Sequence, residues 1–135
     1  PASSTQSTME STMSASAEEE SVLSIELLAQ MRQDMPKRGI NWLIDIFLSE
    51  LPSYLKDLQQ AIASGDGEHV YLKAHKFKGG CKNIGALRMI SLCQRFETLG
   101  RAGDTQQAAQ LMEQQLTQEV EALKAALEQE KLKES

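Results

Sequence analysis

Residues 70–86 read VYLKAHKFKGGCKNIGA, and the apolar side chains in this stretch recur at helical spacing. Each residue of an α-helix advances about 100°, so positions three and four apart share one face. His75 falls roughly 140° from the apolar face on this count and is expected to point into water. The stretch therefore predicts a helix that Gly85 ends, with a buried stripe made of Val70, Ala74, Phe77, Cys81 and Ile84.

The same period continues on both sides of this stretch and predicts four more helices. A short one follows Ser24, a suitable N-cap, and is broken by Pro36 and Gly39. Short connections make neighbouring helices antiparallel. The sequence thus predicts an all-α fold, an antiparallel up-down-up-down four-helix bundle with a short extra N-terminal helix across one end. The apolar stripes of the other helices are, in order, Leu23, Leu27, Leu28 and Met31; Ile40, Leu43, Ile44, Phe47, Leu51, Leu55, Leu58 and Ile62; Met89, Leu92, Cys93, Phe96 and Leu99; and Ala109, Met112, Leu116, Val120, Leu123 and Leu127.

The composition limits the possible classes of function. A chain of 135 residues suits one domain, and an aromatic content of 4% argues against a β-sandwich. The formal net charge of −5 gives no support to nucleic-acid binding. No apolar run is long enough to span a bilayer, and the N-terminus lacks the apolar region of a secretory signal. Two cysteines are too few for a disulfide scaffold or a zinc site, so no metal site is expected.

Residues 1–20 differ from the rest of the chain. They contain six Ser and three Thr, no Val, Ile, Leu or aromatic residue, and end in three glutamates. Such a segment cannot bury enough apolar surface to offset the entropy of ordering it. We therefore expect a disordered Ser/Thr-rich tail or linker over 1–20, followed by a folded domain over 21–132.

The outer face of the helix that contains His75 suggests chemistry. Lys78, Gly79 and Lys82 follow the histidine at i+3, i+4 and i+7, and therefore lie on the same outward side. A glycine inside a helix costs about 1 kcal/mol relative to alanine, so Gly79 is expected to serve the close approach of another protein. Gly80 points sideways, where it can allow a neighbouring helix to pack. A neutral imidazole is a good nucleophile toward an activated phosphoryl group, whose charge Lys78 could screen.

The charge along the chain is uneven around this histidine. Between His69 and Phe96 there is no acidic residue, whereas the rest of the chain has 8 basic and 19 acidic residues. A positive patch on an acidic protein suits an anionic ligand or an acidic partner. The alternative is an ordinary surface histidine among lysines on a solvated helix face. The basic residues of the span are Lys73, Lys76, Lys78, Lys82, Arg88 and Arg95.

This stretch resembles the histidine-containing phosphotransfer (HPt) domain. The resemblance extends through Ser91-Leu92-Cys93 and Phe96-Glu97, includes the turn at residues 61–66, and covers about residues 21–130. Phe77 stands where the family usually has Leu, and Lys76 and Lys82 make the site more basic than many. The family pattern of Ala-His-x-Leu-Lys-Gly, followed after a short run by Gly-Ala, is matched here by Ala74, His75, Lys78, Gly79, Gly85 and Ala86.

The resemblance implies a phosphorelay intermediate without catalysis of its own. His75 would accept a phosphoryl group from a receiver-domain aspartate and relay it to another response regulator, with Lys78 stabilising the phosphate and Gly79 giving the partner access. An upstream hybrid histidine kinase would feed the relay, and Mg²⁺ would be needed only on the receiver. We expect a cytoplasmic monomer with no cofactor, either free-standing or as the cytoplasmic end of a membrane-bound hybrid kinase. Weaker candidates for receiver docking are Tyr71, Leu72, Lys76, Lys82 and Leu87.

Two other functions stay open at this stage. The phosphoacceptor portion of a histidine kinase usually has an acid directly after its histidine and a proline a few residues on. Here Lys76 follows His75, the segment has no proline, and the chain has no ATP-binding motif. A helical adaptor that is never phosphorylated would leave the outward His-x-x-Lys-Gly pattern without a purpose.

Overall fold

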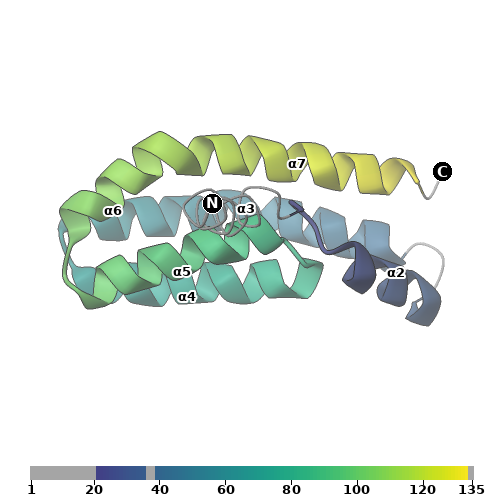
Figure 1. Cartoon of the computed structure of the whole chain (residues 1–135), viewed down its shortest axis with the longest axis horizontal. Coiled ribbons are helices and arrows are strands. Elements are labelled where there is room, and N and C mark those ends of the chain that lie inside the picture. Colours follow the sequence, from purple (N-terminus) through teal and green to yellow (C-terminus); the bar gives the residue numbers. More distant parts are fainter. Residues whose placement is uncertain (1–20, 36–38, 134–135) are drawn as a thin grey trace, which may run out of the picture.

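The computed structural model describes residues 21–35 and 39–133, and this part of the chain is helical with no strand. Figure 1 shows the long helices lying side by side along the molecule, with the short α2 at one end. The predicted all-α four-helix bundle with an extra N-terminal helix is therefore confirmed. The predicted tail over 1–20 and the break at Pro36 lie outside the described residues. The elements are α2 (Ile25–Asp34), α3 (Gly39–Ser64), α4 (Gly67–Ile84), α5 (Leu87–Arg101), α6 (Thr105–Leu111), a π-helical turn η1 (Met112–Leu116) and α7 (Thr117–Leu132).

The helix ends follow the expected local signals. The side chains of Ser24, Asp66 and Asp104 each accept a hydrogen bond from a backbone N–H in the first turn that follows. Such a bond satisfies one of the N–H groups that a helix start leaves unpaired. Gly65 and Gly85 adopt φ values of 74° and 72°, the left-handed conformation that ends α3 and α4.

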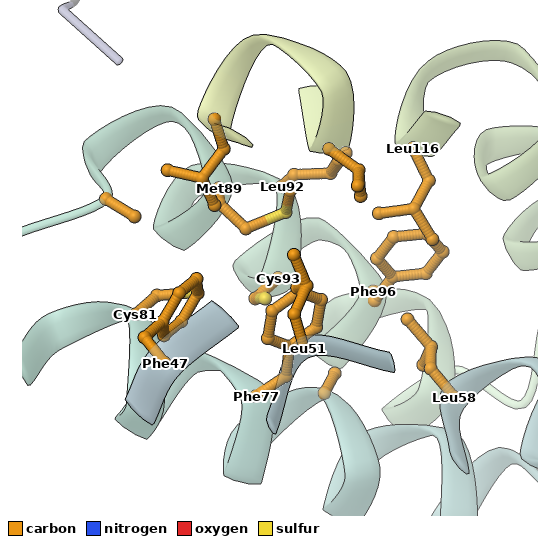
Figure 2. Packing of buried hydrophobic residues seen from close by; sticks show 14 of the residues in the cluster. Phe47, Leu51, Leu58, Phe77, Cys81, Met89, Leu92, Cys93, Phe96 and Leu116 are labelled. Atoms are coloured by element: carbon orange, nitrogen blue, oxygen red, sulfur yellow. The ribbon is translucent and has the colours of Figure 1, made fainter. Parts of the chain in front are cut away.

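The core lies between the four long helices and is entirely apolar where it is deepest. Figure 2 shows side chains from α3, α4, α5 and the last helix meeting there, including Phe47, Phe77, Phe96 and Leu116. The whole predicted stripe of α4 is buried. Both cysteines are buried in this core as free thiols. A hydrogen bond with Cys81, together with burial, raises the pKa of the Cys93 thiol well above its ordinary range.

The predicted stripe is wrong at the start of the last helix. Ala109 is exposed and Met112 is only half-buried, whereas Ala108 and Leu111 are buried. The π-helical turn η1 explains the difference, because its i→i+5 bonding inserts one extra residue into the helix. The buried positions therefore step by five from Leu111 to Leu116 instead of by three or four. From Leu116 onward the predicted stripe is correct.

Helix α2 closes the end of the bundle that contains the α4–α5 turn. The backbone N–H of Ser24 donates to the carbonyl of Gly85 at 2.8 Å. At the other end of α2, Arg32 pairs with Glu130 near the end of α7. These contacts hold α2 against one end of the molecule (Figure 1).

Candidate functional site

His75 lies on the exposed face of α4. Its neighbours Ala74 and Phe77 are fully buried, and this fixes the rotation of the helix. The side chain of His75 is 60% exposed, as its position relative to the buried stripe predicts. His69, six residues earlier, is also exposed but lies in the first turn of α4, where its Nδ1 is 3.1 Å from Asp66.

A carboxylate from α5 holds the imidazole of His75. Nδ1 of His75 is 2.7 Å from Oε2 of Glu97, and the other oxygen, Oε1, accepts a hydrogen bond from Nζ of Lys78 at 2.7 Å. Glu97 is nearly buried, with 8% of the residue exposed. One carboxylate therefore connects two side chains of α4 that lie one turn apart.

Glu97 is ionised at neutral pH. Burial alone would raise the pKa of this carboxyl, but the hydrogen bonds from Lys78 and His75 outweigh it and hold the pKa below the ordinary value. An ionised carboxylate can only accept hydrogen bonds. In the neutral imidazole of His75, Nδ1 must therefore carry the proton, and Nε2 has the free electron pair. Nε2 has no partner among the described residues, so the nucleophilic nitrogen is available to a second molecule.

Two more side chains extend the site toward the N-terminus of α4. The ring of Tyr71 stacks on the imidazole of His75, with ring centroids 5.7 Å apart and planes 22° apart. Arg101, near the end of α5, lies over the ring of Tyr71, with its guanidinium carbon 4.2 Å from the ring centroid. These residues border an open hollow of about 350 Å³ lined by Tyr71, His75, Lys78, Gln94, Glu97, Thr98 and Arg101.

Lys78 is less exposed than its predicted place on the outer face of the helix implies. Its side chain is only 14% exposed and pairs with Glu97. It does lie beside the hollow that His75 borders. Its charge is thus already balanced by a carboxylate before any ligand arrives.

The two adjacent glycines have different surroundings. A Cβ atom built on Gly79 would have no neighbour within 4 Å, so the surface beside His75 is open there. A Cβ on Gly80 would lie 2.5 Å from the hydroxyl of Tyr54, which comes from α3. Gly80 therefore serves helix packing, as its sideways position predicts, whereas Gly79 has no internal packing contact that requires a glycine.

The positive patch is smaller than the sequence suggests. Arg88 pairs with Glu119 of α7, which balances its charge, whereas Arg95 donates to the neutral Gln115 in the π-helical turn and keeps its charge. Lys76 and Lys82 are exposed and form no ion pair with the described residues. The partners of Arg88 and Arg95 could not be predicted, because they lie on helices that are distant in sequence.

The other predicted docking residues differ in exposure. Leu72 is 49% exposed and lies one turn before Lys76 on the outer face of α4. Tyr71 is half-buried because it stacks on His75. Leu87, in the first turn of α5, is half-buried too. Leu72, Lys76 and Lys82 thus share the exposed surface with His75 and Gly79.

Sequence reasoning did not select Arg101 of the hollow, nor did it select Glu97, which contacts His75 directly. Glu97 is the first acidic residue after the acid-free span that starts at His69, and it lies three residues before Gly100, which is buried against α4. A residue three positions from a close helix contact faces the same neighbouring helix. The contact of Gly100 with α4 is known only from the structure, so the sequence alone did not indicate that Glu97 faces α4.

No group of three metal-ligating side chains is arranged to hold a metal ion in the described part of the chain. Among the same residues, no helix is long and apolar enough to cross a membrane.

The fold and the site together define a class, that of helical bundles which present an exposed imidazole held by a nearly buried carboxylate. A family model described as the Hpt domain matches residues 43–126, and the chain belongs to this family. Its role is therefore that of a histidine phosphotransfer domain in two-component phosphorelay signalling. Domains of this family act as phosphoryl carriers and interact with receiver domains.

Two solved structures are similar to the chain. The crystal structure of histidine-containing phosphotransfer protein B (HptB) from Pseudomonas aeruginosa PAO1 is 28% identical, with a TM-score of 0.73, and the match covers 84% of this chain and 97% of that one. The histidine-containing phosphotransfer domain of ArcB from Escherichia coli is 21% identical, with a TM-score of 0.63 and coverage of 83% and 98%; this likeness shows the fold alone. Curated proteins gave no significant match.

Proposed function

We propose that His75 accepts a phosphoryl group from the aspartyl phosphate of a receiver domain and then passes it to the aspartate of another response regulator. One observation carries this assignment. The imidazole of His75 is 60% exposed, yet its Nδ1 lies 2.7 Å from the nearly buried, ionised carboxylate of Glu97, whereas His69 pairs only with the exposed Asp66. Exposure serves a macromolecular partner, and the carboxylate selects which ring nitrogen reacts.

The first transfer begins at Nε2. Its electron pair attacks the phosphorus atom, the P–O bond to the receiver aspartate breaks, and the aspartate leaves as a carboxylate. The new N–P bond makes the ring cationic, because Nδ1 keeps its proton. Glu97 stabilises that positive charge through the hydrogen bond that it already accepts. No proton has to move for the step to occur.

The second transfer is the reverse reaction with a different receiver. A carboxylate oxygen of the acceptor aspartate attacks phosphorus, the P–N bond breaks, and the electron pair returns to Nε2. His75 thereby regains its neutral form with the proton still on Nδ1. The mechanism needs no cofactor on this chain; Mg²⁺ is expected on the receiver, whose site would supply the acid and metal chemistry.

Lys78 and Gly79 have supporting roles in this proposal. Nζ of Lys78 has three N–H donors, so it can keep its bond to Glu97 and still donate to a phosphoryl oxygen above His75. Gly79 leaves open space one turn after His75, which allows the receiver to reach near-attack distance, about 3–3.5 Å. Leu72, Lys76 and Lys82 surround this opening as the proposed docking contacts, with Tyr71 and Leu87 at its border.

A phosphorylated receiver domain supplies the direct test. A receiver labelled with ³²P on its aspartate is mixed with this protein, and the label is expected to transfer to this protein. The adduct is expected to be labile in acid and stable in base, as a P–N bond requires. ATP alone, without a kinase or receiver, is expected to give no label, which separates this function from that of a histidine kinase fragment.

The two histidines of the chain supply a matched pair of variants. His75→Gln is expected to abolish labelling, and His69→Gln to leave it unchanged, because both residues are exposed on α4 but only His75 contacts Glu97. Label that persists in His75→Gln and disappears in His69→Gln would refute the assignment of the site. Absence of label on the unsubstituted protein would favour a helical adaptor that is never phosphorylated.

A further inference from the structure

Arg101 borders the hollow beside His75 but comes from α5, not α4. Its Nη2 donates to the hydroxyl of Tyr71 at 2.8 Å, and its guanidinium lies over the Tyr71 ring. Because Tyr71 in turn stacks on His75, the guanidinium is one side chain away from the imidazole.

The cations near His75 are not equally available. Lys78 is nearly buried and paired with Glu97, so its ammonium group would have to interact with a phosphoryl group and with that carboxylate at the same time. Arg101 is exposed and has no carboxylate partner in the part of the chain that the structure describes. It is therefore the cation of the hollow whose charge is not already balanced by an acid.

The contacts that hold Arg101 are also weak ones. A hydrogen bond to a neutral, exposed hydroxyl and a stacked ring stabilise a guanidinium less than a phosphoryl group does. The planar guanidinium can donate two parallel hydrogen bonds to phosphoryl oxygens, which a lysine cannot do. A phosphoryl group on Nε2 would bring two negative charges to the border of the hollow and draw the Arg101 side chain toward it.

We propose that Arg101 binds the phosphoryl group carried by His75 and so forms a second cationic contact of the phosphorylated state. The inference rests on the proposed function, because it needs a phosphoryl group at His75. In the unphosphorylated protein Arg101 is held by Tyr71. After transfer it exchanges the hydroxyl for phosphoryl oxygens, while Lys78 stays with Glu97.

The second ionisation of the phosphoryl group reports on this contact. The His69→Gln background leaves one reactive histidine, and phosphoramidate, a small donor that needs no receiver, transfers its phosphoryl group to Nε2 with loss of ammonia. ³¹P NMR then follows the titration of the adduct. A unit charge in direct contact, roughly 4 Å away, contributes about 1 kcal/mol in water, which shifts a pKa by about 0.7 units. Arg101→Gln is therefore expected to raise the pKa of the phosphoryl group by about that amount.

Three further variants separate charge from structure. Arg95→Gln removes an exposed arginine of the same helix that lies outside the hollow, and is expected to leave the titration unchanged. Arg101→Lys keeps the charge but lacks the two parallel donors of the guanidinium, and is expected to restore only part of the shift. Tyr71→Phe removes the hydroxyl that holds Arg101 but keeps its charge, and is expected to titrate like the parent protein.

The outcomes distinguish this inference from the function on which it rests. Equal titrations for Arg101→Gln and Arg95→Gln, with His75 phosphorylated, would overturn the role of Arg101 and leave the carrier function standing. If Tyr71→Phe raises the pKa of the phosphoryl group as much as Arg101→Gln does, packing and not charge causes the effect, and the role of Arg101 is overturned as well. If no adduct forms at His75 in the parent protein, both proposals fall.

Discussion

The adjacent glycines of α4 allow helix stability to be separated from partner access. Gly79 and Gly80 have the same backbone conformation and differ only in what a side chain would meet. A Cβ at Gly79 enters open space, whereas a Cβ at Gly80 meets three atoms of the Tyr54 side chain at 2.5–3.0 Å. Tyr54 cannot move aside freely, because its ring stacks on the buried Phe77 at 5.1 Å.

These surroundings give opposite signs for the two alanine substitutions. Gly79→Ala gains helix propensity and lowers the entropy of the unfolded chain, which stabilises the fold by about 1 kcal/mol and raises Tm by about 4 °C. Gly80→Ala gains the same propensity but forces Tyr54 from its stack on Phe77. Overpacking of this kind costs about 1–3 kcal/mol, so the net result is a loss and a lower Tm.

Gly79→Gln extends the comparison to function. The helix tolerates this side chain, because nothing lies within 4 Å of its Cβ, so Tm is expected to change by no more than a few degrees. The longer side chain stands where the receiver must bring its aspartyl phosphate to about 3–3.5 Å from Nε2. Single-turnover phosphotransfer is therefore expected to slow by orders of magnitude, while Gly79→Ala transfers at a rate closer to that of the parent.

Circular dichroism melts and quenched-flow transfer on the three variants test the reasoning together. A lower Tm for Gly79→Ala would mean that the backbone at this position is strained or packed, contrary to its open surroundings. Normal transfer by a stable Gly79→Gln would show that the glycine does not serve partner access. A Gly80→Ala protein more stable than the parent would refute the packing role of Tyr54.

Two further predictions concern charge. The pKa of Glu97 is lowered in the folded protein, so its pairing stabilises the fold above the ordinary value of 4.5, and this stability is lost as the pH falls through the folded-state pKa. Glu97→Gln is therefore expected to flatten the fall in unfolding free energy below about pH 4.5, as measured by urea titration. An unfolding free energy that falls equally steeply in the variant would contradict this. Lys76 and Lys82 are expected to steer an acidic receiver over a Debye length of about 10 Å at 0.1 M salt, so Lys82→Glu should weaken the decline of the transfer rate with salt at sub-saturating receiver. An identical salt dependence in the parent and in Lys82→Glu would exclude that steering.

The apolar period was sufficient to predict the fold, but it missed one register change. Stripes at steps of three and four gave the burial of α4 correctly, because an ordinary α-helix repeats every 3.6 residues. The same assumption failed at Ala109 and Met112, because η1 adds one residue to the helix and so shifts the buried positions before it by one. A five-residue step between Leu111 and Leu116 is visible in the sequence, yet Met112 offers an apolar alternative that fits the regular period.

The site was predicted only in so far as it lies on one helix. His75, Lys78 and Gly79 follow from spacing within α4, and their common side of the helix follows from the same count. The partner of Lys78 could not be predicted this way, because Glu97 is 19 residues further on and belongs to α5. Charge counted along a chain omits such pairs, so the net positive field around His75 was overestimated.

The spacing of α4 and α5 determines whether the carboxylate can hold the imidazole. His75 and Glu97 are on different helices, so their 2.7 Å contact depends on how closely the two backbones approach. A Cβ on Gly100 would lie 2.6 Å from the carbonyl oxygen of Gly67 and 2.7 Å from the backbone nitrogen of Tyr71, both of α4. Only glycine at position 100 permits this approach, one turn from Glu97. The choice of reactive nitrogen on His75 is thus linked to a backbone contact that touches neither the histidine nor its partner.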